Sequence, residues 1–228
     1  FTLEDNIFLP REYIETLKSE FCGVFYDRFI LGKWVAAEGR VYEGFSSENI
    51  ISSQGLAGRL GENRLVLSVI GVDYGGNGSA SAFVHVGFDA GFKNMYVHSE
   101  YYDSRNRSAE SLISAFAEYA AREKERFPML SCACCDSAEQ LLVKSFRRAV
   151  KMEVKNALKR PINTRINMLN RLIAAKRFYV SNECPHVIEA LRGAVWDERD
   201  IHKDVRLDNG TSNIDSLDAM EYAFERYE

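Results

Sequence analysis

The stretch LVLSVIGVDYGGNGSASAFVHV, residues 65–86, decides the fold of this chain. An apolar run ends at Asp73, a glycine-rich turn follows over 75–78, and a second apolar run begins at Ala80. The first run is mostly β-branched and uncharged, which is typical of a strand buried on both faces. Glycines tolerate positive φ and let the chain reverse. The stretch therefore predicts a β-hairpin with a carboxylate at the exit of its first strand.

Two interpretations of Asp73 are open at this point. A carboxylate at the end of a buried strand is costly to hold there without a partner. In the first interpretation the aspartate caps the turn, and in the second it binds a metal ion. A metal site requires further carboxylates from elsewhere in the chain.

The sequence after the hairpin predicts the rest of a mixed sheet. Residues 94–102 are rich in aromatic and β-branched residues and predict a third strand, which completes an antiparallel meander. Ser108 is placed to cap a helix over 109–125, and an apolar strand over 129–135 ends before Asp136. This strand is expected to join the first strand as its parallel neighbour. The pattern predicts an α/β fold with a central mixed sheet flanked by helices.

A basic stretch follows Asp136. Residues 141–159 are expected to be largely helical, although alternating apolar residues over 150–154 leave a strand or hairpin open for the second half. On a helix, the basic residues form one stripe: Lys144, Arg148, Lys151, Lys155 and Lys159. The stripe is either a solvated helix face or a patch that tracks nucleic-acid phosphates beside an acidic site.

The end of the chain contributes a pair of acidic residues. Residues 212–227 predict a terminal amphipathic helix, in which Asp215 and Asp218 lie three positions apart and share one face. Alone, such a pair in a first helical turn often only compensates the helix dipole.

If Asp73, Asp136 and Asp218 came together in one pocket, compensation of the helix dipole would no longer be a sufficient role for Asp218. Three carboxylates in one pocket repel each other and raise one another's pKa, and a divalent cation resolves this conflict. Hard oxygen ligands select Mg²⁺ or Mn²⁺. Two such ions about 3.5–4 Å apart would serve the attacking water and the leaving 3′ oxygen of an in-line phosphodiester displacement.

Residues 1–50 differ in character from the rest of the chain, and we expect a linker or collar segment there, ahead of a domain over 51–228. A helix is predicted over 11–19. The next stretch is dense in aromatic residues, and so large an apolar set is expected to pack on the following domain or on a missing neighbour. Residues 49–63 are expected to form a short strand and a turn.

Composition excludes several classes of protein. The 228 residues carry a net charge of −4, so any contact with nucleic acid is expected to be local. No apolar run reaches about 18 residues, so neither a membrane-spanning helix nor a membrane partner is expected. The chain begins with Phe1 and shows no secretory signal, and we expect it to be a piece of a longer polypeptide.

Cysteine and histidine residues point to packing roles. The five cysteines lack the spacing of a disulfide framework or a zinc site, so we expect buried, reduced thiols in a reducing compartment. His98 is expected to pack within its strand, and His186 and His202 are expected at the surface.

The order of these acidic residues along the predicted elements resembles the RNase H-like nucleases. Three stretches are similar, more narrowly, to the C-terminal nuclease domain of the large terminase subunit of tailed bacteriophages. FYDRFILGKWVAAEGRVYEGF, residues 25–45, resembles the segment that links the packaging ATPase to the nuclease. GVDYGGNGSASAFVHVGF, residues 71–88, resembles the family's first active-site hairpin, and NIDSLDAMEYAFERY, residues 213–227, its terminal acidic helix.

This resemblance implies an endonuclease that cuts concatemeric double-stranded DNA during viral genome packaging. By the resemblance, Asp73, Asp136 and Asp218 are the catalytic metal ligands for two Mg²⁺ or Mn²⁺ ions, and Asp215 lies near the second ion. The implied partners are the terminase ATPase domain, the small terminase subunit and the portal protein, in the cytoplasm of the host cell. No stretch fits G-x4-G-K-[ST], so the domain alone would cut DNA without ATP and could not translocate it.

Two other functions compete with the nuclease. An actin- or sugar-kinase-like ATPase also begins with a strand, a glycine-rich turn containing an aspartate and a second strand, but it needs a duplicated phosphate loop and a longer chain. A non-catalytic docking module of the packaging motor would use the aromatic collar of residues 21–45 as its interface, and its aspartates would merely cap.

Overall fold

The computed structural model describes residues 3–35, 37–62, 64–75, 79–105, 108–138, 140–199, 205–208 and 213–227. The predicted glycine turn at 76–78, His202 and Ser212 at the start of the predicted terminal helix lie outside these ranges. Within them, one seven-stranded sheet has the strand order β1-β7-β4-β3-β2-β5-β6. None of the described helices combines the length and apolar character needed to cross a bilayer.

The predicted meander and its parallel neighbour are confirmed. Strands β2 (Leu65–Asp73), β3 (Ser81–Asp89) and β4 (Met95–Asp103) pair in antiparallel fashion. Strand β5 (Leu130–Cys135) follows the predicted helix and pairs with β2 in parallel. β2 is therefore a central strand with a neighbour on each side, which explains its continuous apolar run.

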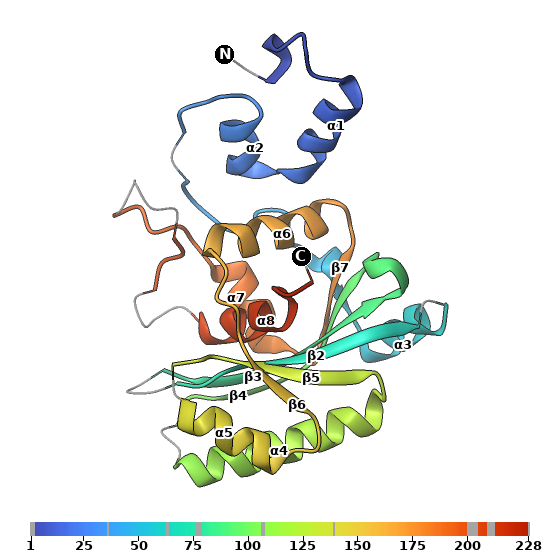
Figure 1. Cartoon of the computed structure of the whole chain (residues 1–228), viewed down its shortest axis with the longest axis vertical. Coiled ribbons are helices and arrows are strands. Elements are labelled where there is room, and N and C mark those ends of the chain that lie inside the picture. The colour runs from blue at the N-terminus through green and yellow to red at the C-terminus, as the bar shows by residue number, and fades with distance from the viewer. Residues whose placement is uncertain are drawn as a thin grey trace.

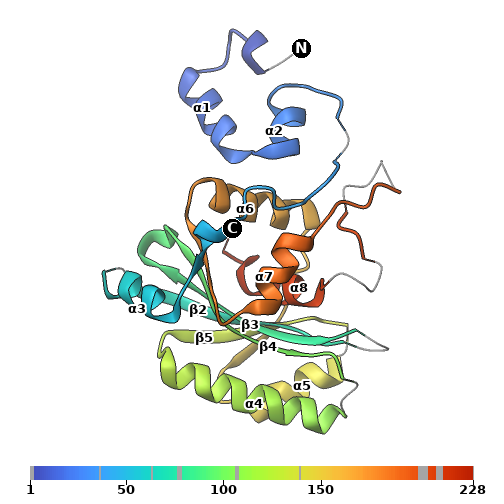
Figure 2. The ribbon, with the colours of Figure 1, turned by 180° about the vertical axis from the view of Figure 1, so that it is seen from behind.

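Helices cover both faces of the sheet (Figures 1 and 2). Helices α4 (Ala109–Arg126) and α5 (Gln140–Ala149) lie on one face, and the side chain of Ser108 caps α4 by accepting a hydrogen bond from the backbone N–H of Ser111. The other face carries three helices: α6 (Ile162–Ala174), α7 (Pro185–Gly193) and α8 (Asp215–Phe224). Strand β7 (Phe178–Ser181) joins the sheet between β4 and β1 (Ile50–Ile51).

Of the two possibilities left open for the second half of 141–159, the strand is confirmed and the continued helix is wrong. Helix α5 ends at Ala149, and the chain then forms the edge strand β6 (Glu153–Asn156), which pairs with β5 in parallel. The alternation at 150–154 is therefore the correct signal, because Val154 is buried while its neighbours are not. The single basic stripe breaks up as a result: Lys144 and Arg148 lie on α5, Lys151 precedes the strand and Lys155 lies on it.

A second prediction, the turn before β2, is also wrong. Residues 53–62 form helix α3 (Ser53–Glu62) despite three glycines. The Ser52 hydroxyl accepts a hydrogen bond from the N–H of Gly55 in its first turn, and the buried Leu56 packs with Tyr96 and Tyr179. Tertiary packing thus overrides a weak helix propensity.

The N-terminal segment contains the short helices η1 (Leu3–Asp5), α1 (Arg11–Glu20), α2 (Gly23–Phe29) and η2 (Ser47–Asn49). Helices α1 and α2 stand apart from the layers around the sheet (Figure 1). The aromatic collar packs only in part: Phe25, Tyr42 and Phe45 are buried, whereas Phe29 is 62% and Trp34 103% exposed. The domain boundary at residue 50 stays a prediction.

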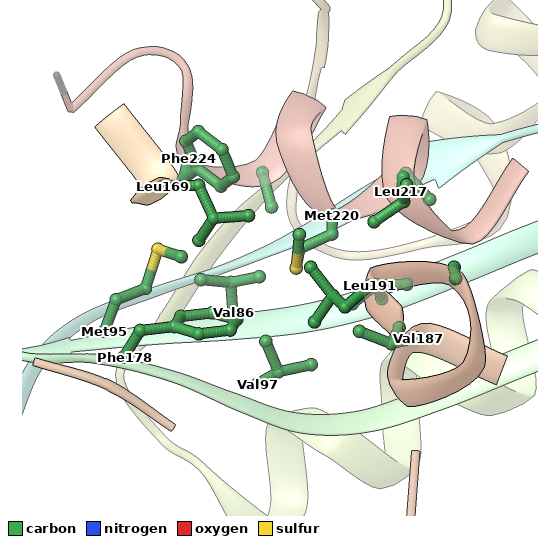
Figure 3. Close-up of a cluster of buried hydrophobic side chains, with 14 of the residues drawn as sticks. Val86, Met95, Val97, Leu169, Phe178, Val187, Leu191, Leu217, Met220 and Phe224 are labelled. Atoms are coloured by element: carbon green, nitrogen blue, oxygen red, sulfur yellow. The ribbon is translucent and has the colours of Figure 1, made fainter. Parts of the chain in front are cut away.

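The larger core lies between the sheet and helices α6, α7 and α8 (Figure 3). Leu217, Met220 and Phe224 of α8 are almost completely buried there, as the amphipathic pattern predicted. Tyr227 is partly buried against the same cluster. As predicted, the cysteines are free thiols; four of them are buried and Cys22 is partly exposed.

Helix α8 lies directly on β2 at Gly71. A Cβ atom at Gly71 would stand 1.6 Å from the carbonyl oxygen of Ala219 and 2.9 Å from the backbone nitrogen of Ala223. The absence of a side chain at position 71 therefore permits the contact between helix and strand. This contact places the first turn of α8 near the end of β2.

We expect Gly71→Ala to lower the free energy of unfolding by about 1–3 kcal/mol or more, because α8 must move away from β2. Urea denaturation followed by circular dichroism measures this change. Gly58→Ala in α3 is the matched control, since a Cβ there meets nothing within 4 Å. That control should be neutral or stabilising by up to about 1 kcal/mol. Equal effects of the two substitutions would contradict the close contact.

His98 is buried, as predicted, beside a second buried histidine. Its ring lies 4.4 Å from that of Phe127 and 5.1 Å from that of His85, centroid to centroid. Burial, and then the nearby His85 and Arg126, hold the pKa of His98 well below its ordinary value. Burial also lowers the pKa of His85, whose Nδ1 lies 3.0 Å from Glu123 Oε2.

These shifts predict acid sensitivity of the fold. The folded chain keeps His98 neutral, while the unfolded chain takes up its proton below pH about 6.5, so stability is lost as the pH falls through and below that value. His98→Leu removes one group that binds a proton on unfolding. The slope of the free energy of unfolding against pH should therefore fall by up to about 1.4 kcal/mol per pH unit, the contribution of one proton. Urea titrations between pH 5 and 8 measure both slopes. Identical slopes would refute the assignment.

Candidate active site

Two neighbouring strands bring Asp73 and Asp136 to the same edge of the sheet. Val72 pairs in parallel with Cys135, and the N–H of Asp136 donates to the carbonyl of Val72 at 2.9 Å. Asp73 ends β2, and Asp136 is the first residue after β5. Neighbouring strands lie about 4.8 Å apart, so the two side chains leave the sheet close together.

Helix α8 adds Asp215 and Asp218 to this edge. Asp215 Oδ2 accepts a hydrogen bond from the N–H of Ala80, next to the start of β3, at 3.1 Å. Asp218 precedes Ala219, which rests on Gly71. The predicted carboxylates from two strands and one helix therefore gather in one place, and their catalytic roles stay predictions.

The electrostatics of Asp73 reflect this gathering. The pKa of Asp73 is raised well above its ordinary value, first by burial and then by the negative charges of Asp218, Asp215 and Asp136. The pKa of Tyr222, one turn after Asp218, is raised by burial and then by the charges of Asp218, Asp73 and Asp136. Its hydroxyl lies 3.4 Å from Asp136 Oδ2. The site thus carries more negative charge than its surroundings readily accommodate.

Nearby cations partly balance this charge. Lys159 Nζ lies 2.7 Å from Asp136 Oδ1, and Arg206 Nη2 lies 2.6 Å from Asp218 Oδ1. In the described ranges, no group of three or more His, Cys, Asp or Glu side chains is arranged to hold a metal ion. The donor chemistry nevertheless fits a hard divalent cation, because the site is made of carboxylate oxygens that repel one another.

Glu225 fixes the position of Lys159. Its Oε1 accepts hydrogen bonds from the N–H groups of Leu158 and Lys159, and its Oε2 accepts one from Arg160. Lys159 has a φ of 52°, a left-handed conformation that costs energy for a residue with a side chain. The buried Glu225 stabilises that conformation and so directs the lysine toward Asp136.

Sequence reasoning missed the roles of Arg206, Glu225 and Tyr222, and it assigned Lys159 to the basic stripe. Tyr222 and Glu225 lie four and seven residues after Asp218, on the same helical side, which is the one signal that could have found them. Arg206 stands in a polar segment without periodicity, and nothing local marks it.

The basic residues proposed to bind DNA do not share one helix face. Lys144 and Arg148 are exposed on α5 and Lys151 is exposed just after it, while Lys155 on β6 lies 3.1 Å from Glu153 Oε2. Their role in DNA binding stays a prediction. His186, which was expected at the surface, is 39% exposed in its side chain, and its Nδ1 lies 2.7 Å from Glu100 Oε1.

The fold and the site together define an RNase H-like α/β domain with an acidic centre at one sheet edge. A family model described as "Terminase RNaseH-like domain" matches residues 70–226, and the chain belongs to this family. This membership removes the basis for the actin- or sugar-kinase-like alternative. No curated protein sequence matches the chain at a significant level.

Solved structures of phage terminases have the same fold. The large terminase of a thermophilic bacteriophage superposes with a TM-score of 0.79 at 20% identity, over 100% of this chain and 55% of that one. The present chain therefore spans about half the length of that protein.

Two solved nuclease domains are also similar. The nuclease domain of the g2p large terminase of bacteriophage SPP1, with bound Mn, gives a TM-score of 0.59 at 17% identity, covering 85% of this chain and 100% of that one. The large terminase nuclease of thermophilic phage G20c, with bound magnesium, gives a TM-score of 0.50 at 15% identity, covering 71% of this chain and 82% of that one.

Proposed function

We propose that this chain is a divalent-metal-dependent DNA endonuclease that cuts concatemeric double-stranded DNA during viral genome packaging. The observation that carries the proposal is the gathering of Asp73, Asp136, Asp215 and Asp218 at one sheet edge, where the pKa of Asp73 is raised first by burial and then by the negative charges of the other three. Membership of the terminase RNase H-like family supports it, as do the Mn and magnesium in two structures of similar fold.

In this proposal Asp73, Asp136 and Asp218 hold two Mg²⁺ or Mn²⁺ ions, with Asp215 beside the second. When bound, the ions supply an activated water and stabilise the charge on the leaving 3′ oxygen. The protein contributes the orientation of these ligands. Asp136 is held by the N–H of Ala138 on its Oδ1 at 2.7 Å and by its own backbone bond to β2. Lys159, with 45% of its side chain exposed, presents a positive charge where a DNA phosphate would arrive.

The wider assignment extends to the packaging machine. The proposed partners are double-stranded DNA, the terminase ATPase domain, the small terminase subunit and the portal protein, in the host cell cytoplasm. The sequence lacks a G-x4-G-K-[ST] motif, so we assign ATP-driven translocation to the ATPase domain. Because the chain carries a net charge of −4, we expect these partners to supply part of the positive charge that binds DNA.

A non-catalytic docking module is the second candidate. It is favoured by the large apolar side chains exposed in the N-terminal segment, of which Ile7, Phe8 and Trp34 are 85%, 88% and 103% exposed. Such a surface is typical of protein contacts. In this alternative the acidic residues have only structural roles.

Single substitutions distinguish the two candidates. Asp73→Asn, Asp136→Asn and Asp218→Asn should each lower Mn²⁺-dependent nicking of supercoiled plasmid by about 100-fold or more, because even the outer partners of metal ligands are worth about 10–100-fold. Each variant should keep the circular dichroism spectrum of the unaltered chain.

Asp197→Asn is the matched control, because Asp197 pairs with the exposed Arg199 and lies outside the group of acidic residues at the sheet edge. It should cut at the rate of the unaltered chain. Cleavage that survives in all three active-site variants would refute the assignment. Absence of cleavage by the unaltered chain with every divalent ion tried would favour the docking module.

Charge removal tests the proposed DNA contacts. Simultaneous substitution of Lys144, Arg148, Lys151 and Lys155 by Ala should weaken DNA binding and flatten its salt dependence. The slope of log K against log [salt] should fall by about 0.9 for each DNA phosphate that the protein no longer neutralises. Fluorescence anisotropy with labelled duplex DNA measures the slope.

The control removes the same charge elsewhere: Arg11, Lys18, Lys33 and Lys176 are replaced by Ala. Since non-specific electrostatics would respond to net charge alone, equal effects of the two quadruple variants would contradict a local DNA-binding patch.

A further inference from the structure

Arg206 lies behind Asp218 in a buried cluster of charges. Only 2% of its side chain is exposed. Its Nη2 donates to Asp218 Oδ1 at 2.6 Å and to Glu221 Oε2 at 3.3 Å. Its Nη1 donates to Glu221 Oε1 and to the hydroxyl oxygen of Tyr42. One guanidinium thus joins α8 to the collar segment.

The charges in this cluster balance without the other acidic residues of the site. Arg165 Nη1 from α6 lies 2.8 Å from Glu221 Oε2, so two guanidinium groups face the two carboxylates of Asp218 and Glu221. The Tyr42 hydroxyl donates to Glu221 Oε1 at 3.0 Å. Arg206 is therefore held from behind by Glu221 and Tyr42, in an orientation that does not depend on Asp73 or Asp136.

The two oxygens of Asp218 have different surroundings. Arg206 contacts Oδ1, and Arg165 Nη1 approaches the same atom at 3.8 Å. For Oδ2, the described residues provide no hydrogen bond or ion pair. A carboxylate that is fixed through one oxygen presents the other in a defined direction, and such outer partners tune the affinity of metal ligands.

We propose that Arg206 is a positioning residue that fixes Asp218 through Oδ1 and leaves Oδ2 to bind a divalent cation. This inference rests on the proposed nuclease function. The aromatic collar contributes to the same support, because Tyr42 belongs to it and its hydroxyl contacts Arg206. In this role Arg206 acts through Asp218 rather than directly on DNA or the reacting atoms.

Three variants test the positioning role: Arg206→Gln, Arg206→Lys and Tyr42→Phe. Isothermal titration calorimetry measures the Kd for Mn²⁺, and plasmid nicking is followed over a range of Mn²⁺ concentrations. Arg206→Gln should raise the Kd by about 10–100-fold. Its nicking rate should recover toward that of the unaltered chain at saturating Mn²⁺, which a merely structural defect would not produce.

The other two variants should raise the Kd for Mn²⁺ by smaller amounts. Arg206→Lys keeps the charge but cannot bridge Asp218, Glu221 and Tyr42 with one planar fork, so its Kd should be intermediate. Tyr42→Phe removes a support of Arg206 without touching Asp218, and it should raise the Kd less. Arg199→Gln in the same segment is the control and should bind Mn²⁺ like the unaltered chain, because Arg199 pairs with Asp197 alone among the described residues.

The outcomes separate the two proposals. Unchanged or tighter Mn²⁺ binding in the Arg206 variants, beside normal binding and cleavage by the unaltered chain, would overturn the positioning role alone. If the unaltered chain neither binds Mn²⁺ nor nicks DNA, the proposed function fails and this inference fails with it. Should Arg206→Gln not fold, the graded increase in Kd in Arg206→Lys and Tyr42→Phe decides the question.

Discussion

The direct contact of helix α8 with strand β2 is the constraint on which the acidic site depends. Gly71 removes a side chain from the strand, and the backbone of α8 at Ala219 and Ala223 occupies the space. The helix can therefore begin beside the end of β2, where Asp73 leaves the sheet. A larger residue at position 71 would keep the sheet and the helix but separate the carboxylates that they carry.

Apolar packing holds the like charges together. The core beneath α8 joins Leu217, Met220 and Phe224 to side chains of the sheet and of α6 and α7, as Figure 3 shows. Burial of these side chains provides stabilisation that opposes the repulsion between the nearby carboxylates. The compensating cations come from separate segments: Lys159 follows β6, Arg165 lies on α6 and Arg206 lies in the segment before α8. The acidic centre is thus a property of the whole fold.

Much of this arrangement could be predicted from local patterns. The uncharged run ending at Asp73 identified the central strand, and the apolar run before Asp136 identified its parallel neighbour. The edge strand β6 was harder, because its residues fit both helical and strand periods and only pairing with β5 decides between them. Arg206 could not be predicted: its partners are Tyr42, far earlier in the chain, and two residues of the following helix. Contacts of that range leave no mark on neighbouring sequence.

Helix α8 bears a candidate ligand near one end and, just past its other end, the carboxylate that holds Lys159. Its ten residues form a rod about 15 Å long. Because a short helix resists bending, Asp218 and Glu225 must move in concert when the rod tilts or slides. A mechanical load on this one element would therefore displace an acidic and a basic group of the site at the same time.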